Sequence, residues 1–115
     1  MNWTPLLTEQ QIEEIKANSS DSPQIIFKHS IRCGTSHIAK NRLEKNESSV
    51  STDFYFVDVI RHRSLSNKIA SDFGIHHESP QILIIKNGTC VYNESHYGIN
   101  MEDIRANLHK TETAL

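Results

Sequence analysis

The sequence predicts a single α/β domain in which helices and strands alternate along the chain. Short apolar runs of strand length lie at 24–29, 53–60 and 81–86, and apolar residues at helical spacing lie between them. Alternation of this kind is typical of parallel strands joined by right-handed crossovers. A chain of 115 residues fits one domain, which we expect to span 1–115.

Local signals mark the first helix and the first strand. Thr8 and Gln11 have the spacing of a capping box, and isoleucines at helical spacing follow them, which predicts a helix over about 9–18. The polar stretch NSSDSP ends this helix. The run QIIFKH at 24–29 then predicts a short strand.

The middle of the chain predicts a helix, a buried strand and another helix. Apolar residues recur at helical spacing over about 34–45, and the run DFYFVDVI at 53–60 is rich in residues that favour strands. A polar loop is expected between them, at 46–53. An apolar helical stripe begins at Leu65, and Gly74 is expected to end that helix.

The clearest local signal is Asn87-Gly88, which lies between the apolar runs at 81–86 and 89–94. Both residues tolerate the positive φ of a tight turn, so the pair predicts a hairpin. From Asn100 on, apolar residues three and four apart predict a C-terminal helix. The expected order is therefore α-β-α-β-α-β-β-α, with a four-stranded mixed sheet flanked by helices and the hairpin at one edge.

Composition and charge argue against two classes of partner. The formal net charge of −2 gives no basic field for a phosphate backbone, so neither nucleic acid nor a membrane is expected as a partner. No segment approaches the ~20 apolar residues of a membrane span, and the N-terminus lacks the pattern of a secretory signal. We therefore expect a cytoplasmic protein whose two cysteines are reduced thiols.

Cys33 lies where the strand at 24–29 gives way to the helix at 34–45. A cysteine at a helix N-terminus faces unpaired N–H groups and the positive end of the helix dipole, and Arg32 adds a positive charge beside it. Cysteines in such places have pKa values of roughly 3.5 to 7.5, against ~8.5 for a free thiol. We therefore predict that Cys33 is the nucleophile of a thiol-disulfide exchange; the alternative is an inert packing cysteine.

The position three residues after Cys33, where a resolving cysteine would lie, is Ser36. A serine cannot expel a mixed disulfide, so an external thiol must resolve the adduct on Cys33. The Ser36 hydroxyl either donates a hydrogen bond to the Cys33 sulfur or belongs only to the first turn of the helix. His29, at the end of the strand, either tunes the thiol or is a structural histidine.

The second cysteine and the histidines predict no further chemistry. Because the run 81–86 separates Cys90 from the end of the sheet near Cys33, we expect the two thiols to lie on the order of 20 Å apart. A disulfide needs Cα atoms within about 7 Å, so Cys90 is expected to be a packing residue. Seven histidines raise the question of a metal site, but no Cys-x-x-Cys or His-x-x-x-His pair occurs, and we expect no metal.

The element order, the place of Cys33 and the pair Ser79-Pro80 before the hairpin together resemble the thioredoxin fold over nearly the whole chain. Within that superfamily, the stretches FKHSIRCGTS, SPQILIIKNG and SHYGI are most similar to the monothiol bacilliredoxins. Those proteins usually carry T-C-P-x-S around the thiol, and here Arg32 and Gly34 differ from that pattern.

The resemblance implies an activity and a substrate site. It implies that Cys33 removes a small, bacillithiol-like thiol from S-thiolated client proteins, with the small thiol as co-substrate and no cofactor. It also implies a cis peptide bond before Pro80, and a Ser79 backbone that pairs with the substrate in the manner of strand addition.

Two other functions are compatible with the sequence. The motif CGTS resembles the CGFS of monothiol glutaredoxins, which share an iron-sulfur cluster with glutathione between two subunits. In those proteins a glycine pair grips the glutathione, and here the corresponding stretch reads YNESHYGIN. The third possibility is a non-enzymatic adaptor with a thioredoxin fold and an incidental cysteine.

Overall fold

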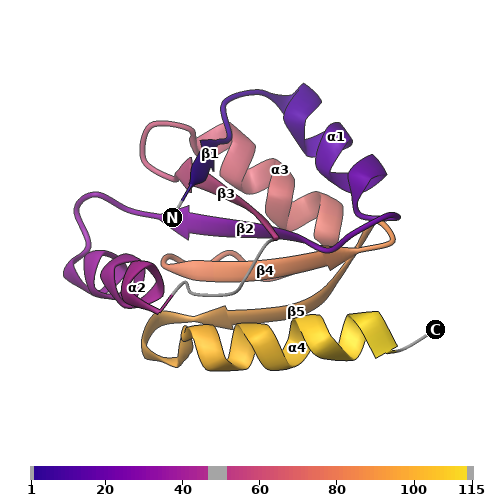
Figure 1. The fold of residues 1–115 in the computed structure, drawn as a ribbon. Helices are drawn as coiled ribbons and strands as arrows, with labels where there is room; N and C mark the ends of the chain where they lie inside the picture. Colours follow the sequence, from indigo (N-terminus) through magenta and orange to yellow (C-terminus); the bar gives the residue numbers. More distant parts are fainter. Residues whose placement is uncertain (1, 47–51, 114–115) are drawn as a thin grey trace.

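A mixed β-sheet forms the centre of the molecule, and helices cover both of its faces (Figure 1). The computed structural model describes residues 2–46 and 52–113. The polar loop expected at 46–53 lies largely outside the described residues. In chain order the elements are β1 (Trp3–Pro5), α1 (Glu9–Asn18), β2 (Gln24–His29), α2 (Gly34–Lys45), β3 (Asp53–Asp58), α3 (Arg63–Phe73), β4 (Gln81–Lys86), β5 (Thr89–Ser95), η1 (His96–Gly98) and α4 (Met101–Thr113).

The sheet combines a parallel part with an antiparallel hairpin, and its strand order is β1-β3-β2-β4-β5. The strands β1, β3 and β2 are parallel, whereas β4 is antiparallel to β2 and β5 is antiparallel to β4. The predicted parallel pairing and the hairpin at one edge are therefore confirmed. All six residues of β2 are buried, as is typical of a strand covered on both faces.

The prediction of four strands is wrong, because β1 adds a fifth strand at the edge of the sheet, where Trp3 lies in register with Phe54. A strand of three residues that ends in Pro5 is too short to show an alternating pattern, although proline is tolerated in an edge strand. The Trp3 ring anchors β1, because its centroid lies 5.5 Å from that of Phe27, 5.6 Å from that of Phe54 and 6.0 Å from that of Phe56.

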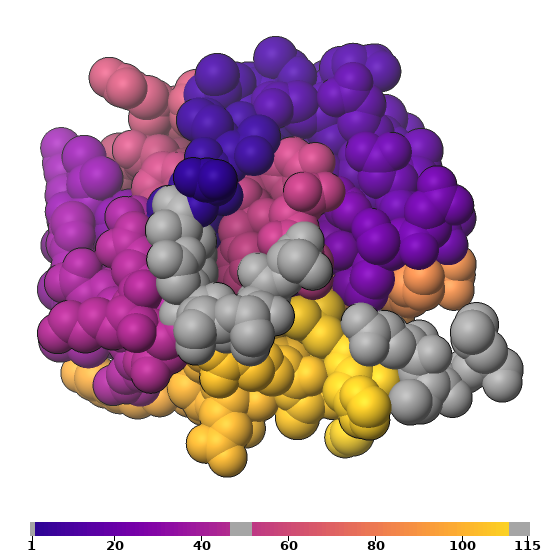
Figure 2. Space-filling view, in the orientation of Figure 1, coloured from indigo at the N-terminus to yellow at the C-terminus, as the bar shows by residue number. Residues whose placement is uncertain are grey.

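Each face of the sheet has its own apolar core. Ile25 and Phe27 of β2 belong to the core under α2 and α4, and Ile26 belongs to the core under α1 and α3. Because side chains alternate along a strand, Lys28 lies on the α1/α3 face and His29 on the α2/α4 face. Figure 2 shows, in the orientation of Figure 1, the surface of α1 at the upper right, that of α2 at the left and that of α4 at the bottom.

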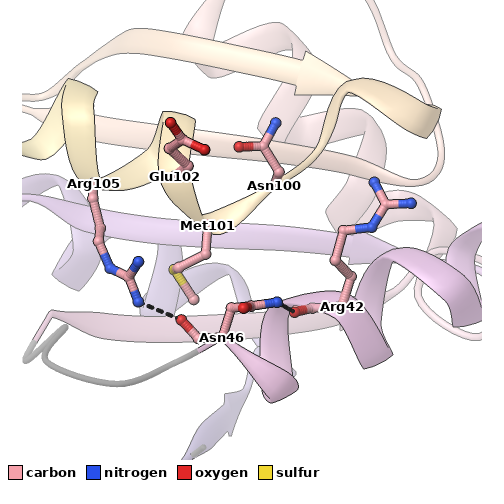
Figure 3. Close-up of a pocket in the computed structure, with 6 residues that line it drawn as sticks. All are labelled: Arg42, Asn46, Asn100, Met101, Glu102 and Arg105. Carbon is pink, nitrogen blue, oxygen red and sulfur yellow. Dashed lines mark hydrogen bonds between the residues drawn. The ribbon is translucent and has the colours of Figure 1, made fainter.

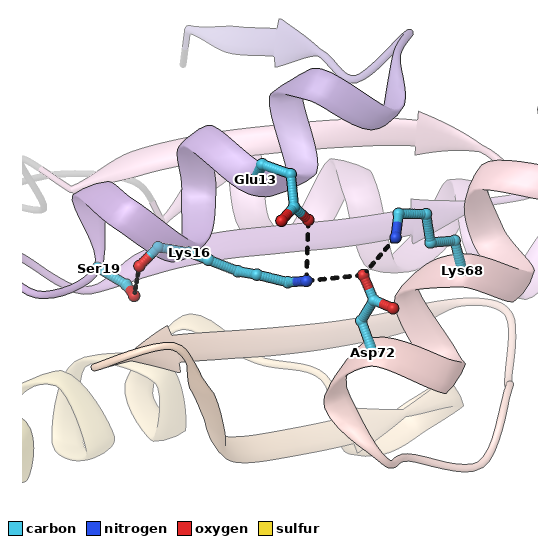
Figure 4. A network of polar contacts seen from close by, with 5 residues as sticks. All are labelled: Glu13, Lys16, Ser19, Lys68 and Asp72. Atoms are coloured by element: carbon cyan, nitrogen blue, oxygen red, sulfur yellow. Dashed lines mark hydrogen bonds and ion pairs between the residues drawn. The ribbon is translucent and has the colours of Figure 1, made fainter.

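A network of charges joins α1 to α3 (Figure 4). The Lys16 ammonium of α1 lies 2.9 Å from Glu13 and 2.8 Å from Asp72 of α3, and Lys68 contacts the same Asp72 carboxylate at 2.8 Å. Partly exposed ion pairs of this kind contribute about 0–1 kcal/mol each. The apolar contacts beneath them therefore supply most of the stabilisation between the two helices.

The predicted helix end and hairpin turn have the backbone geometry that their residues favour. Gly74 ends α3 in the left-handed conformation, with φ 62°. Asn87 and Gly88 have φ 52° and 76°, so both central residues of the turn between β4 and β5 adopt positive φ. Both predictions are confirmed.

Replacing Trp3 with alanine is expected to destabilise the protein by about 2–3 kcal/mol, because the ring packs on three phenylalanines. The substitution also removes the hydrogen bond from the indole N–H to Glu44 at 2.8 Å. Urea unfolding measures the loss. Leu7→Ala is the matched control, because Leu7 is exposed; equal losses in the two variants would contradict the role assigned to β1.

Candidate active site

Cys33 occupies the N-cap position of α2, directly after the loop that follows β2. Its carbonyl oxygen accepts the backbone N–H groups of Ser36 at 3.1 Å and His37 at 3.2 Å, and its own N–H donates to the carbonyl oxygen of Ser30 at 3.1 Å. The side chain is half-buried. The predicted junction of strand, cysteine and helix is confirmed.

The N-terminus of α2 has no side chain that caps it and no acidic residue in its first turn. The first N–H groups of a helix lack intrahelical partners and carry the positive end of the helix dipole. The Cys33 thiol therefore lies beside the positive end of the α2 dipole.

Ser36 is fully buried, and its hydroxyl joins α2 to the end of β2. Its oxygen lies 2.6 Å from Nδ1 of His29 and accepts the backbone N–H of Ser30 at 3.0 Å. A hydroxyl has one proton and two acceptor lone pairs, so the tautomer of His29 sets which partner donates in the Ser36–His29 hydrogen bond. Neither partner is the Cys33 sulfur, and Ser36 is thus a fixed part of the scaffold around the thiol.

His29 is buried, and its Nδ1 is the hydrogen-bond partner of the Ser36 hydroxyl. Its ring packs against Phe56 at 5.2 Å and edge-on against His37 at 4.8 Å between centroids. Burial, with a smaller contribution from the neighbouring His37, lowers the pKa of His29 to about 4. The ring is therefore neutral at physiological pH.

Arg32 is exposed, and its guanidinium makes no hydrogen bond or ion pair within the described part of the chain. Its charge lies next to Cys33 in the sequence, in solvent. The structure therefore places Cys33, Ser36 and His29 in one connected group and leaves Arg32 outside its hydrogen bonds.

The Ser79-Pro80 peptide bond is cis, as the resemblance implied. Pro80 is buried, and it directly precedes β4. Gln81 lies in register with Lys28, close to the end of β2 that leads to Cys33, so both segments lie at one end of the sheet. The Ser79 hydroxyl oxygen is buried and has no hydrogen-bond partner among the described residues.

Cys90 lies near the opposite end of the hairpin, where it pairs with Ile85 close to the turn. It packs against the α1/α3 core, and its thiol donates to the carbonyl oxygen of Tyr92 at 3.3 Å. Burial raises the pKa of Cys90 above the ordinary value for a thiol. These contacts are those of the packing residue that the sequence predicted.

A buried polar cluster that the sequence analysis did not predict lies on the other face of the sheet. Lys28 is fully buried, and its ammonium lies 2.7 Å from Nδ1 of His77, which is also 3.1 Å from the hydroxyl oxygen of Ser66. The available signal was a lysine directly after the apolar run IIF at 25–27. Lysines are almost never fully buried unless they are paired.

A cavity of about 350 Å³ lies between the C-terminal end of α2 and the start of α4 (Figure 3). Asn46 and Arg105 face each other across it and are joined by a hydrogen bond from the guanidinium to the carbonyl oxygen of Asn46. Asn100 caps α4 by accepting the N–H of Asp103 at 2.8 Å. The cavity lies at the other end of α2 from Cys33 and belongs to the contact between two helices.

Within residues 2–46 and 52–113, no group of three or more His, Cys, Asp or Glu side chains could hold a metal ion. No helix in these ranges has both the length and the apolar character needed to cross a membrane.

Solved structures with the same architecture are thioredoxin-fold proteins. One described as a candidate oxidoreductase with a thioredoxin fold is 29% identical, with TM-score 0.80, over 90% of this chain and 91% of that one. The reduced thioredoxin pre-protein of Schistosoma mansoni is 16% identical, with TM-score 0.73, over 96% and 98%. The thioredoxin of Malassezia sympodialis is 19% identical, with TM-score 0.70, over 95% and 90%.

The fold and the cysteine at its strand-helix junction thus define a thiol oxidoreductase of the thioredoxin superfamily. The family model "Monothiol bacilliredoxin BrxC" matches residues 4–104, and the chain belongs to that family. The resemblance in the sequence is therefore confirmed.

His29 makes the stability depend on pH. Its pKa is about 4 in the folded protein and about 6.5 when unfolded, so the unfolded chain binds more protons between these values. His29 therefore lowers the free energy of unfolding as the pH falls from ~6.5 towards 4, by up to ~3 kcal/mol, and causes no such loss above pH ~6.5. Urea unfolding at pH 4.5 and 7 measures this loss.

The variant His29→Asn keeps a hydrogen-bonding side chain beside the Ser36 hydroxyl but does not titrate. It is expected to lose less stability than the wild type on acidification. The matched control is His76→Asn, because His76 is exposed. The same acid sensitivity in wild type and His29→Asn would show that His29 does not titrate as inferred.

Proposed function

We propose that this protein removes a small thiol from protein mixed disulfides by monothiol exchange at Cys33. The observation that supports the proposal most is the first turn of α2. There the Cys33 thiol lies at a helix N-terminus that no side chain caps, and the residue three positions later is a serine that is hydrogen-bonded to His29. Cys33 is thus equipped to attack a disulfide, with no neighbouring thiol to displace the product.

The reaction has two exchange steps. In the first, the Cys33 thiolate attacks the small-thiol sulfur of the client mixed disulfide. A disulfide forms between Cys33 and the small thiol, and the client sulfur leaves as a thiolate that takes a proton from water. In the second, the thiolate of another small-thiol molecule attacks this adduct, regenerating the Cys33 thiolate and releasing the small thiol as its own disulfide.

The small thiol is proposed to be bacillithiol or a similar molecule, because the family is that of the monothiol bacilliredoxins. It acts as co-substrate, and the proposed reaction uses no cofactor. S-thiolated proteins are the proposed clients, with neither nucleic acid nor a membrane as partner. The cytoplasm is the proposed location, since its thiols are kept reduced.

Ser79 and Pro80 are the proposed substrate-binding residues. They directly precede β4 at the end of the sheet where β2 leads to Cys33. An extended substrate segment lying beside Ser79 would pair with its backbone in the manner of an added strand. Such pairing orients the disulfide towards the thiol.

The variant Cys33→Ser is expected to abolish release of bacillithiol from a model client protein, because serine does not attack a disulfide at neutral pH. Cys90→Ser is the matched control and is expected to retain full activity. In the wild type, iodoacetamide is expected to alkylate Cys33 faster than Cys90, because burial raises the pKa of Cys90. Loss of activity in Cys90→Ser alone, or equally slow labelling of both thiols, would refute the assignment.

A further inference from the structure

The Lys28 and His77 cluster has an unusual charge arrangement. Lys28 is fully buried, and its nearest polar neighbour is another basic side chain, at 2.7 Å. Within the residues that the structure describes, no carboxylate forms an ion pair with Lys28. Burying a cation without a carboxylate costs stability. A role other than stability therefore has to account for this lysine.

The hydrogen-bond chemistry fixes the protonation of the pair. A lysine ammonium only donates, so Nδ1 of His77 must accept from it, and the histidine is neutral. Burial, followed by the charge of Lys28, lowers the pKa of His77, in agreement with a neutral ring. Burial also lowers the pKa of Lys28 to about 8.

The Lys28 and His77 cluster connects β2 to the segment that carries the cis-proline. His77 is three residues before Pro80, and its contact with Lys28 ties this segment to β2. Gln81 holds the same segment from β4, because its amide donates to the carbonyl oxygen of His76 at 3.0 Å and its side-chain oxygen accepts the N–H of Glu78 at 3.3 Å. Side chains of β2 and β4 therefore both form hydrogen bonds with the segment 74–80.

We propose that Lys28 and His77 are positioning residues that hold the segment 74–80 so that Ser79 and Pro80 face the substrate of Cys33, and that protonation of His77 releases this segment. The proposal rests on the function proposed above, since it concerns the substrate-binding part of the same site.

The charges around His77 explain why its protonation releases the segment. A protonated His77 would face the Lys28 ammonium at 2.7 Å, with Arg63 of α3 and His76 adding positive charge. Glu78 is the acidic side chain that acts on His77 in the opposite sense. Two cations at such a distance repel each other strongly in a buried site, so the contact opens on acidification.

The variant Lys28→Met tests the positioning role, because methionine is of similar length and fits a buried site. We expect an about tenfold rise in KM for a bacillithiol-carrying client protein, equivalent to ~1.4 kcal/mol of lost binding. The alkylation rate of Cys33 by iodoacetamide should stay within about twofold, since this small reagent does not use the segment. The melting temperature should rise, because a buried cation has been removed.

Hydrogen exchange of the peptide 74–81 gives a readout that does not depend on activity. We expect faster exchange in Lys28→Met than in the wild type at pH 7.5. After correction for the intrinsic pH dependence of exchange, the wild-type peptide should also exchange faster at pH 5 than at pH 7.5. The same peptide in Lys28→Met should show no such increase. Lys86→Met is the matched control, because Lys86 lies at the opposite end of β4.

Several results would overturn the proposal. An unchanged KM together with unchanged exchange at 74–81 would show that Lys28 does not position the segment. A parallel loss of melting temperature, Cys33 alkylation and activity would show that Lys28 only supports the fold. Wild-type exchange that does not depend on pH would refute release by protonation. If the wild type released no bacillithiol, the proposed function would fail, and hydrogen exchange would still decide whether Lys28 holds the segment.

Discussion

The hydrogen bond between the Ser36 hydroxyl and Nδ1 of His29 determines where Cys33 lies. It joins the last residue of the central strand to the first turn of α2 at 2.6 Å, and the same hydroxyl accepts the N–H of Ser30. The loop that carries Cys33 is therefore held at both ends. Because His29 is neutral and buried, this bond persists at physiological pH. The serine that replaces a resolving cysteine thus has a structural task of its own.

The central strand β2 supports both halves of the site from its last two residues. Lys28 points to the α1/α3 face and contacts His77, in the segment that carries Pro80. His29 points to the opposite face and contacts Ser36, in the helix that carries Cys33. Cys33 and the proposed substrate segment are thus connected to adjacent residues of one buried strand. In the proposed reaction, this shared support orients a bound disulfide towards the Cys33 thiol.

Much of the fold followed from local patterns, because β2, β4 and the Asn87-Gly88 turn are specified by their own residues. The position of Cys33 at a strand-to-helix junction was also predicted, because the spacing of apolar residues changes from that of a strand to that of a helix around it. The strand β1 did not follow, because the packing of Trp3 against distant rings decides it. Nor did the contacts of His29 and Lys28, since their partners depend on tertiary structure. The cis bond before Pro80 followed only from the family resemblance.

In the proposed monothiol reaction, Cys33 keeps its adduct until an outside thiol arrives. Intact-protein and peptide mass spectrometry test it directly, after the protein is mixed with a bacillithiol-carrying client in the absence of free thiol. Monothiol exchange at Cys33 predicts one bacillithiol adduct, confined to Cys33, that persists until free bacillithiol is added and then disappears. An adduct on Cys90, or loss of the adduct without free thiol and with formation of a Cys33–Cys90 disulfide, would contradict it.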